Sequence, residues 1–170
     1  MIKAVFSGSK IYSNSQESFS LCEKSSYGEK KAGKVEYSLI EALFLLSENK
    51  LCIYYKNKLL LESDFTKKAL KIDKKIESKL IAFSDLRKRG YIVKTALKFG
   101  ADFRVYNRGV KPGKDHALWI LYVTKESQHL TWQDFAAKNR IAHSTKKKLL
   151  IAIVDEESDV SYYEVSWLKP

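Results

Sequence analysis

The chain has 170 residues, of which 45% are hydrophobic and 30% charged, a balance typical of a folded globular protein. No apolar run approaches the roughly 20 residues that a membrane helix needs, and the N-terminus lacks the apolar segment of a secretory signal, so we expect a cytoplasmic protein without a membrane partner. The net charge of +11 favours a polyanionic partner, because lysine and arginine displace counterions from phosphates. A lysine-rich surface of thermophilic type would give the same charge.

The first half of the chain predicts a mixture of short strands and helices. Residues 1–35 alternate short apolar pieces with Gly, Ser and Lys, which is typical of small antiparallel strands and turns. Apolar side chains then recur at helical spacing over residues 35–50. Two strands are expected at 51–55 and 59–61, and a second helix, capped by Ser63 and Asp64, is expected to run to about residue 80.

The second half has a different texture. A third helix over residues 82–88 is followed by a strand, a turn and a strand within 91–106. Residues 117–123 and 149–154 are nearly continuous apolar runs, as in buried strands, with a short helix after Thr131 between them, and residues 160–168 alternate like an edge strand. The predicted fold is therefore α+β to mixed α/β: a small α+β domain at 1–80 and a C-terminal α/β domain with a central mixed sheet at 81–170.

The signatures of phosphate-binding loops, dinucleotide-binding folds, zinc proteases and serine hydrolases are absent. Metal-dependent nucleases commonly pair an acid on one strand with acid-x-Lys on the next, and no acid-x-Lys follows Asp102. A metal-free reaction on RNA stays open, because RNA carries its own nucleophile in the 2′-hydroxyl. Such a reaction needs a base, an acid and a cation that stabilises the charge on phosphorus.

Tyr106, His116 and a lysine of the run 146–148 form such a set. Histidine suits the acid and lysine the cation, whereas tyrosine accepts a proton only where positive charge favours the phenolate. By spacing alone, a tyrosine and a histidine at the mouth of a hairpin are more often structural.

The stretches KTALKFGADFRVYNRG, DHALWILYV, RIAHSTKKKLLIAIVD and YYEVSWLKP resemble the catalytic subunit of archaeal tRNA splicing endonucleases, also called tRNA-intron lyases. The resemblance covers the chain from about residue 34 to its end. It implies cleavage of precursor tRNA at bulge–helix–bulge splice sites, leaving 2′,3′-cyclic phosphate and 5′-hydroxyl ends without a metal or other cofactor. Tyr106 would be the general base toward the 2′-hydroxyl, His116 the general acid toward the leaving 5′-oxygen, and Lys147 the stabiliser of the transition state.

The resemblance also implies roles for residues outside this triad. Arg140 matches an arginine that stacks on a bulge base, and Lys146, Lys148 and Arg108 are further candidates for RNA binding. An acidic loop would dock into a basic cleft of a neighbouring subunit, within an assembly of four chains that is either a homo-oligomer or includes a structural subunit; its residues are Asp155, Glu156, Glu157 and Asp159.

Two alternatives follow from the same residues. An RNA-binding structural subunit of the same assembly would have lost the triad, and all three members are present here. A metal-dependent nuclease on a similar scaffold would reveal itself by dependence on Mg²⁺.

Overall fold

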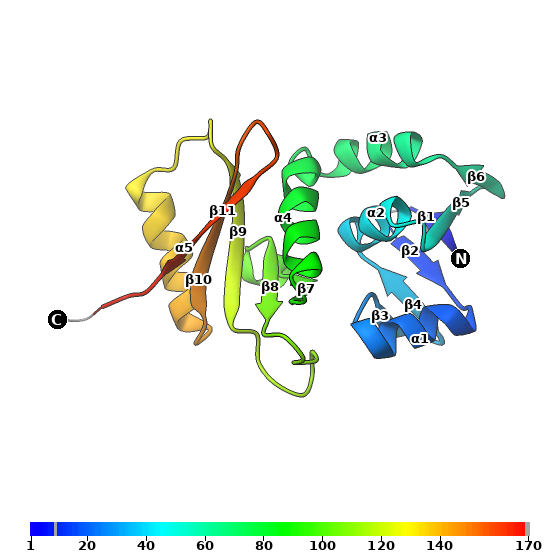
Figure 1. Ribbon diagram of the computed structural model, residues 1–170, viewed down its shortest axis with the longest axis horizontal. Coiled ribbons are helices and arrows are strands. Elements are labelled where there is room, and N and C mark those ends of the chain that lie inside the picture. The colour runs from blue at the N-terminus through cyan, green and yellow to red at the C-terminus, as the bar shows by residue number, and fades with distance from the viewer. Residues whose placement is uncertain (9, 169–170) are drawn as a thin grey trace. The chain divides into compact units, whose positions relative to one another are not determined.

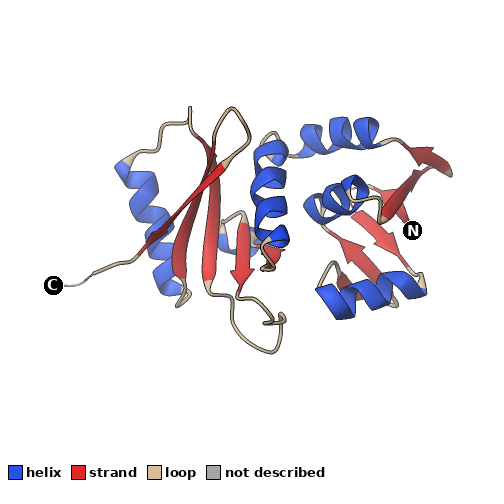
Figure 2. Ribbon diagram, in the orientation of Figure 1, coloured by secondary structure: helices blue, strands red, loops and turns tan. Residues whose placement is uncertain are grey.

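The computed structural model describes residues 1–8 and 10–168 (Figure 1). Contacts divide the chain into two units, Met1–Leu80 and Ile81–Pro170, and each unit has its own sheet (Figure 2). Lys169 and Pro170, which end the motif YYEVSWLKP, lie outside the described residues. Within the described ranges, no helix is long and apolar enough to cross a membrane.

The N-terminal unit is a six-stranded sheet with helices. Its strands follow the order β3-β4-β2-β1-β5-β6, in which β1 and β5 are parallel and the other neighbours antiparallel. Burial alternates along β1, so that one face of the sheet carries the core. The elements are β1 (Ile2–Ser7), β2 (Lys10–Ser13), α1 (Gln16–Ser25), β3 (Glu29–Lys31), β4 (Lys34–Tyr37), α2 (Leu39–Ser47), β5 (Leu51–Tyr55), β6 (Lys58–Leu60) and α3 (Glu62–Ile72).

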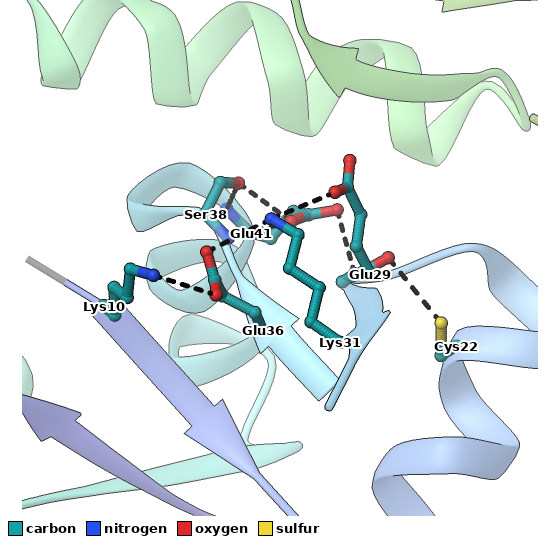
Figure 3. Close-up of polar contacts among 8 residues, drawn as sticks. Lys10, Cys22, Glu29, Lys31, Glu36, Ser38 and Glu41 are labelled. Carbon is teal, nitrogen blue, oxygen red and sulfur yellow. Dashed lines mark hydrogen bonds and ion pairs between the residues drawn. The ribbon is translucent and has the colours of Figure 1, made fainter. Parts of the chain in front are cut away.

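A buried carboxylate fixes the start of α2 (Figure 3). Ser38 and Glu41 form a capping box, in which Glu41 Oε2 accepts hydrogen bonds from Ser38 N at 3.0 Å and Ser38 Oγ at 2.8 Å. The other carboxylate oxygen, Oε1, accepts from the backbone N–H of Gly28 at 3.0 Å. Gly28 has φ +72°, and a Cβ there would lie 2.4 Å from Val35, so this loop requires glycine.

Three helix predictions for this unit were wrong in detail. Residues 16–25 form α1, capped by Ser15, although only strands and turns were expected before residue 35. Residues 35–37 belong to β4, so the following helix begins later, at Leu39. The helix expected over 63–80 is interrupted after Ile72, and its second part joins the expected third helix in α4 (Ile76–Lys88).

The C-terminal unit is a five-stranded sheet with the order β11-β10-β9-β8-β7. β9 and β10 are parallel and connected through α5, whereas the remaining neighbours are antiparallel. The elements that follow α4 are β7 (Ile92–Thr95), a 3₁₀ turn η1 (Leu97–Phe99), β8 (Phe103–Tyr106), β9 (Trp119–Lys125), α5 (Trp132–Ser144), β10 (Lys148–Val154) and β11 (Val160–Val165).

Helices α4 and α5 lie on opposite sides of this sheet (Figure 1). On the α5 side, Ile120, Leu149 and Ala142 are the centre of a buried cluster. On the α4 side, the rings of Phe83 and Phe103 pack with centroids 5.8 Å apart. The alternation of side chains along each strand decides which residues face α4 and which face α5. The α+β fold class predicted from the sequence is confirmed.

Candidate active site

The predicted site residues belong to segments that meet at one edge of the C-terminal sheet. β8 runs antiparallel to β9, so its last residue, Tyr106, lies where β9 begins. β10 runs parallel to β9, with Lys148 paired to Trp119, so its first residues lie at the same edge. Two backbone hydrogen bonds join the three segments there, from Leu118 N to Val105 O and from Lys148 N to Leu118 O.

A hollow of about 570 Å³ opens at this edge, and we call it the loop hollow. One wall comes from the loop between β8 and β9, including His116, and the other from the segment between α5 and β10, including Lys147. Two residues predicted from distant parts of the sequence therefore face the same space. The lining residues are Asn107, Val110, Asp115, His116, Ala117, Leu118, His143, Lys146, Lys147 and Lys148.

The end of α5 determines where Lys147 lies. Lys146 has φ 55°, its N–H donates to His143 O, and the N–H of Lys147 donates to Ala142 O, both at 2.9 Å. These two bonds and the left-handed conformation of Lys146 define a Schellman motif, in which glycine usually holds the left-handed position. Here a lysine holds it, and the motif turns the chain directly from the helix into β10.

The ammonium of Lys147 is held by a backbone carbonyl and lies near an aromatic ring. Lys147 is half-buried, whereas Lys146 and Lys148 are exposed. Its Nζ donates to the carbonyl of Thr145 at 2.8 Å and lies 5.9 Å from the centroid of the Phe99 ring, within the range of a cation–π interaction. Of the three lysines, the middle one is thus the one whose ammonium is positioned beside the hollow by the backbone and a ring rather than by a carboxylate.

His116 is exposed in the loop between β8 and β9. Its backbone N–H donates to the carboxylate of Asp115 at 2.7 Å, and both residues line the hollow. A histidine in this position can exchange protons with a molecule bound in the hollow.

Tyr106 differs from the other two residues of the predicted triad. It is only 5% exposed and is not among the residues that line the loop hollow, although Asn107, which follows it, is. Because side chains alternate along β8 and Phe103 faces α4, Tyr106 and Arg104 face the α5 side. Arg104 lies over the ring of Phe99, 5.7 Å from its centroid, as Lys147 does.

The remaining basic residues proposed for RNA binding have different surroundings. Lys146 lines the loop hollow. Lys148 also lines it, but its Nζ lies 2.7 Å from Glu164 Oε1, while Trp119 Nε1 donates to Glu164 Oε2 at 2.7 Å. The hydrogen bond from Lys148, and to a smaller extent that from Trp119, holds the pKa of the Glu164 carboxyl below its ordinary value. Arg108 lies outside the hollow, with its guanidinium 5.1 Å from the centroid of the Tyr91 ring.

Arg140 lines a second, mostly apolar hollow of about 450 Å³ on α5, which we call the helix hollow. Its other walls are Phe135, Ala136, Asn139, His143 and Trp167. The Arg140 Nε donates to Ala136 O at 3.4 Å, which turns the guanidinium back along the helix.

Comparison with known proteins agrees with this architecture. Residues 2–66 match the model for the N-terminal domain of tRNA intron endonucleases, and residues 76–162 match the model for the catalytic C-terminal domain. The chain belongs to the tRNA intron endonuclease family. A tRNA-splicing endonuclease of Pyrococcus horikoshii is 39% identical over 169 residues, covering 99% of this chain and 97% of that protein. A tRNA-splicing endonuclease of Nanoarchaeum equitans is 44% identical over 141 residues, covering 79% and 90%.

The loop hollow lies entirely within the region matched to the family's catalytic domain. The acidic residues 155–159, in contrast, form the turn between β10 and β11 at the other end of these strands (Figure 1). The backbone N–H of Asp159 donates to Asp155 Oδ1 at 2.8 Å, which closes the turn, and the acidic side chains from Glu156 to Asp159 are exposed.

Sequence reasoning missed the aromatic and acidic residues around the lysines. Phe99 beside Lys147 and Glu164 beside Lys148 become neighbours only through strand register and the position of η1, which no local pattern reveals. The rings of His143 and Trp167 are likewise neighbours only in the folded chain, 4.4 Å apart in a T-shaped contact. The part of the chain that the structure describes contains no group of three or more His, Cys, Asp or Glu placed to hold a metal ion.

Proposed function

We propose that this chain cuts precursor tRNA at the borders of its intron, at bulge–helix–bulge sites, by acid–base catalysis without a metal. The observation that carries the proposal is the loop hollow, which His116 and Lys147 share within the region matched to the family's catalytic domain. The net charge of +11 suits a polyanionic substrate.

The reaction gives each of the three residues one role. The 2′-oxygen of the nucleotide before the cut attacks phosphorus, and its proton passes to the phenolate of Tyr106. The bond between phosphorus and the 5′-oxygen breaks, and His116 gives its proton to that oxygen. The products are a 2′,3′-cyclic phosphate and a 5′-hydroxyl, and Lys147 stabilises the negative charge on the phosphate oxygens as the bonds exchange.

The buried position of Tyr106 sets a condition on this proposal. The hydroxyl has to reach the 2′-hydroxyl of an RNA that occupies the loop hollow, from the strand end beside Asn107. Catalytic hydrogen bonds in ligand-free structures are often long and tighten when the substrate binds, so the RNA would have to approach the end of β8, where Tyr106 lies.

The helix hollow supports recognition of an unpaired nucleotide. Its aromatic walls, Phe135 and Trp167, and the guanidinium of Arg140 are groups on which an unstacked base can lie. We propose that Arg140 stacks on a bulge base there, and that Lys146, Lys148 and Arg108 contact the phosphates around it. Recognition of splayed bases would explain a preference for bulges over continuous helix.

We further propose an assembly of four chains, because two cuts at a fixed separation need two active sites held apart. β11 is an edge strand of the C-terminal sheet and is available for pairing with a second copy. The acidic turn from Asp155 to Asp159 would dock into a basic cleft of a neighbouring chain.

Substrate shape tests the proposed function. The purified chain should cut a precursor tRNA whose intron borders form two bulges, and should leave intact the same RNA after compensating changes pair both bulges. Equal cutting of the two RNAs would indicate a general ribonuclease. Binding of both without cutting would indicate the structural subunit, and would contradict the proposal.

A further inference from the structure

The loop hollow and the helix hollow have one lining residue in common. That residue is His143. The loop hollow carries the groups suited to a phosphodiester, and the helix hollow carries the apolar surface suited to a base. The side chain at their junction therefore lies between the two parts of any nucleotide that occupies both.

The position of the His143 ring is defined on one side and open on the other. It lies edge to face with the Trp167 ring, with centroids 4.4 Å apart and planes at 74°, and its side chain is exposed. Its carbonyl accepts the N–H of Lys146 in the Schellman motif, so the same turn fixes His143 and Lys147 relative to each other. Imidazole has both a flat face for stacking and N–H donors for phosphate oxygens.

We propose that His143 is a specificity-determining residue, which couples the seating of an unpaired base in the helix hollow to the placement of the adjacent phosphodiester in the loop hollow. The ring stacks against the base beside Trp167, and a ring N–H donates to a phosphate oxygen. An RNA without a base at that position loses the contact and is held loosely at the site of cutting. This inference rests on the function proposed above.

The test compares two RNAs and three proteins. One RNA has a bulge–helix–bulge, and the other is identical except that the bulge nucleotide next to the cut is abasic. The proteins are the wild type, His143→Ala and His129→Ala. His129 is an exposed histidine of the loop before α5 that lines neither hollow, and it serves as the matched control.

We expect His143→Ala to lower kcat/KM for the intact RNA by about 10-fold, the order expected for the loss of one base-stacking contact. The same substitution should change cutting of the abasic RNA by less than about 2-fold. Without a seated base this RNA has lost the stacking contact, and its loosely held phosphodiester no longer meets the ring N–H. His129→Ala should match the wild type on both RNAs. His143→Phe should restore part of the binding of the base without restoring the phosphate contact.

Binding measured without cutting separates this inference from the proposed function. For this measurement both RNAs carry a 2′-deoxy nucleotide before each of the two cuts, which removes both nucleophiles, and fluorescence anisotropy gives Kd for each protein. One outcome is that the wild type fails to cut the RNA that has all its 2′-hydroxyls, while His143→Ala still weakens binding of the RNA with the base and not of the abasic RNA. That result would refute the proposed function and keep the inference. An equal effect of His143→Ala on both RNAs, or no effect on either, would overturn the inference whether or not the wild type cuts.

Discussion

Lys147 is distinguished from Lys146 and Lys148 by its contacts rather than by its chemistry. All three are lysines in one run, yet only the Lys147 ammonium is held by the Thr145 carbonyl and lies over the Phe99 ring. A fixed cation beside a reacting phosphate stabilises developing charge without the cost of reorganising at that moment. The structure therefore gives a physical reason for the resemblance to single out the middle lysine.

We expect Lys147→Ala to lower kcat by about 10²- to 10³-fold with little change in KM, because a preorganised charge acts mainly on the transition state. Single-turnover cutting of a bulge–helix–bulge RNA measures the effect. Lys125→Ala, at the far end of β9, removes the same charge away from the site and should leave kcat unchanged. A loss confined to KM would make Lys147 a binding residue and would contradict its assigned role.

Replacing Phe99 tests what holds that lysine. Phe99→Leu keeps an apolar side chain but removes the ring, and the loss of a cation–π contact of about 0.5–1 kcal/mol should lower kcat by about 2- to 5-fold. Phe99→Tyr keeps a ring and should retain most of the rate. Equal rates for the two variants, measured under single-turnover conditions, would show that the ring does not position Lys147.

Candidate residues for the site could be chosen from the sequence more readily than their surroundings could be predicted. Tyr106, His116 and Lys147 were chosen from residue chemistry and the resemblance, and the structure brings His116 and Lys147 to one hollow. The burial of Tyr106 and the pairing of Lys148 with Glu164 depend on which face of a strand each residue occupies. That face is fixed by register between segments far apart in the chain.

At the scale of elements, the Schellman motif at the end of α5 connects fold to site. A non-glycine residue in the left-handed region is strained by roughly 1–2 kcal/mol, and Lys146 occupies it at φ 55°. Replacing Lys146 by glycine should raise the free energy of unfolding by up to about 1 kcal/mol, since relieved strain exceeds the added freedom of the unfolded chain. Denaturant unfolding of Lys146→Gly and Lys146→Ala compares variants that both lack the charge, and a less stable glycine variant would contradict this account.

A second prediction concerns the contact between β11 and α4. Tyr162 Oη donates to Asp85 Oδ2 at 2.8 Å. The pKa of the phenol is raised, mainly by burial and secondly by this hydrogen bond. Because the unfolded chain loses that proton near pH 10 and the folded chain keeps it, this contribution to stability is present below pH 10 and declines as the pH rises further. The difference in Tm between wild type and Tyr162→Phe should therefore shrink between about pH 9 and 11, whereas a constant difference would contradict the assigned cause.

The elements that sequence reasoning found are those with strong local signals. The apolar runs became β9 and β10, and Thr131 caps α5 through a capping box with Asp134. α1 was missed because its core-facing side is marked by Ser18, which is buried and bonded to Tyr37, rather than by an apolar stripe. The break between α3 and α4 was missed because Asp73, which accepts the N–H of Lys75, resembles any other charged residue of that run.

For the whole molecule, the acidic turn is the contact that we propose between chains. If the acidic turn docks on a neighbouring chain, Glu156→Gln/Glu157→Gln should shift the protein from four chains toward smaller species, because it removes two charges without touching the Asp155–Asp159 bond. Light scattering after size exclusion measures the mass. Glu62→Gln/Glu77→Gln makes the same charge change in the N-terminal half and should leave the mass unaltered; equal masses for all three proteins would exclude the turn from assembly.

We propose above that His116 and Lys147 serve a metal-free cleavage of RNA. The most direct measurement is cutting of a bulge–helix–bulge RNA by the purified chain in excess EDTA, with analysis of the product ends. We predict 2′,3′-cyclic phosphate and 5′-hydroxyl ends, and a loss of cutting of about 10²-fold or more in His116→Ala. Cutting that fails in EDTA and returns with Mg²⁺, or that survives in His116→Ala, would contradict the account.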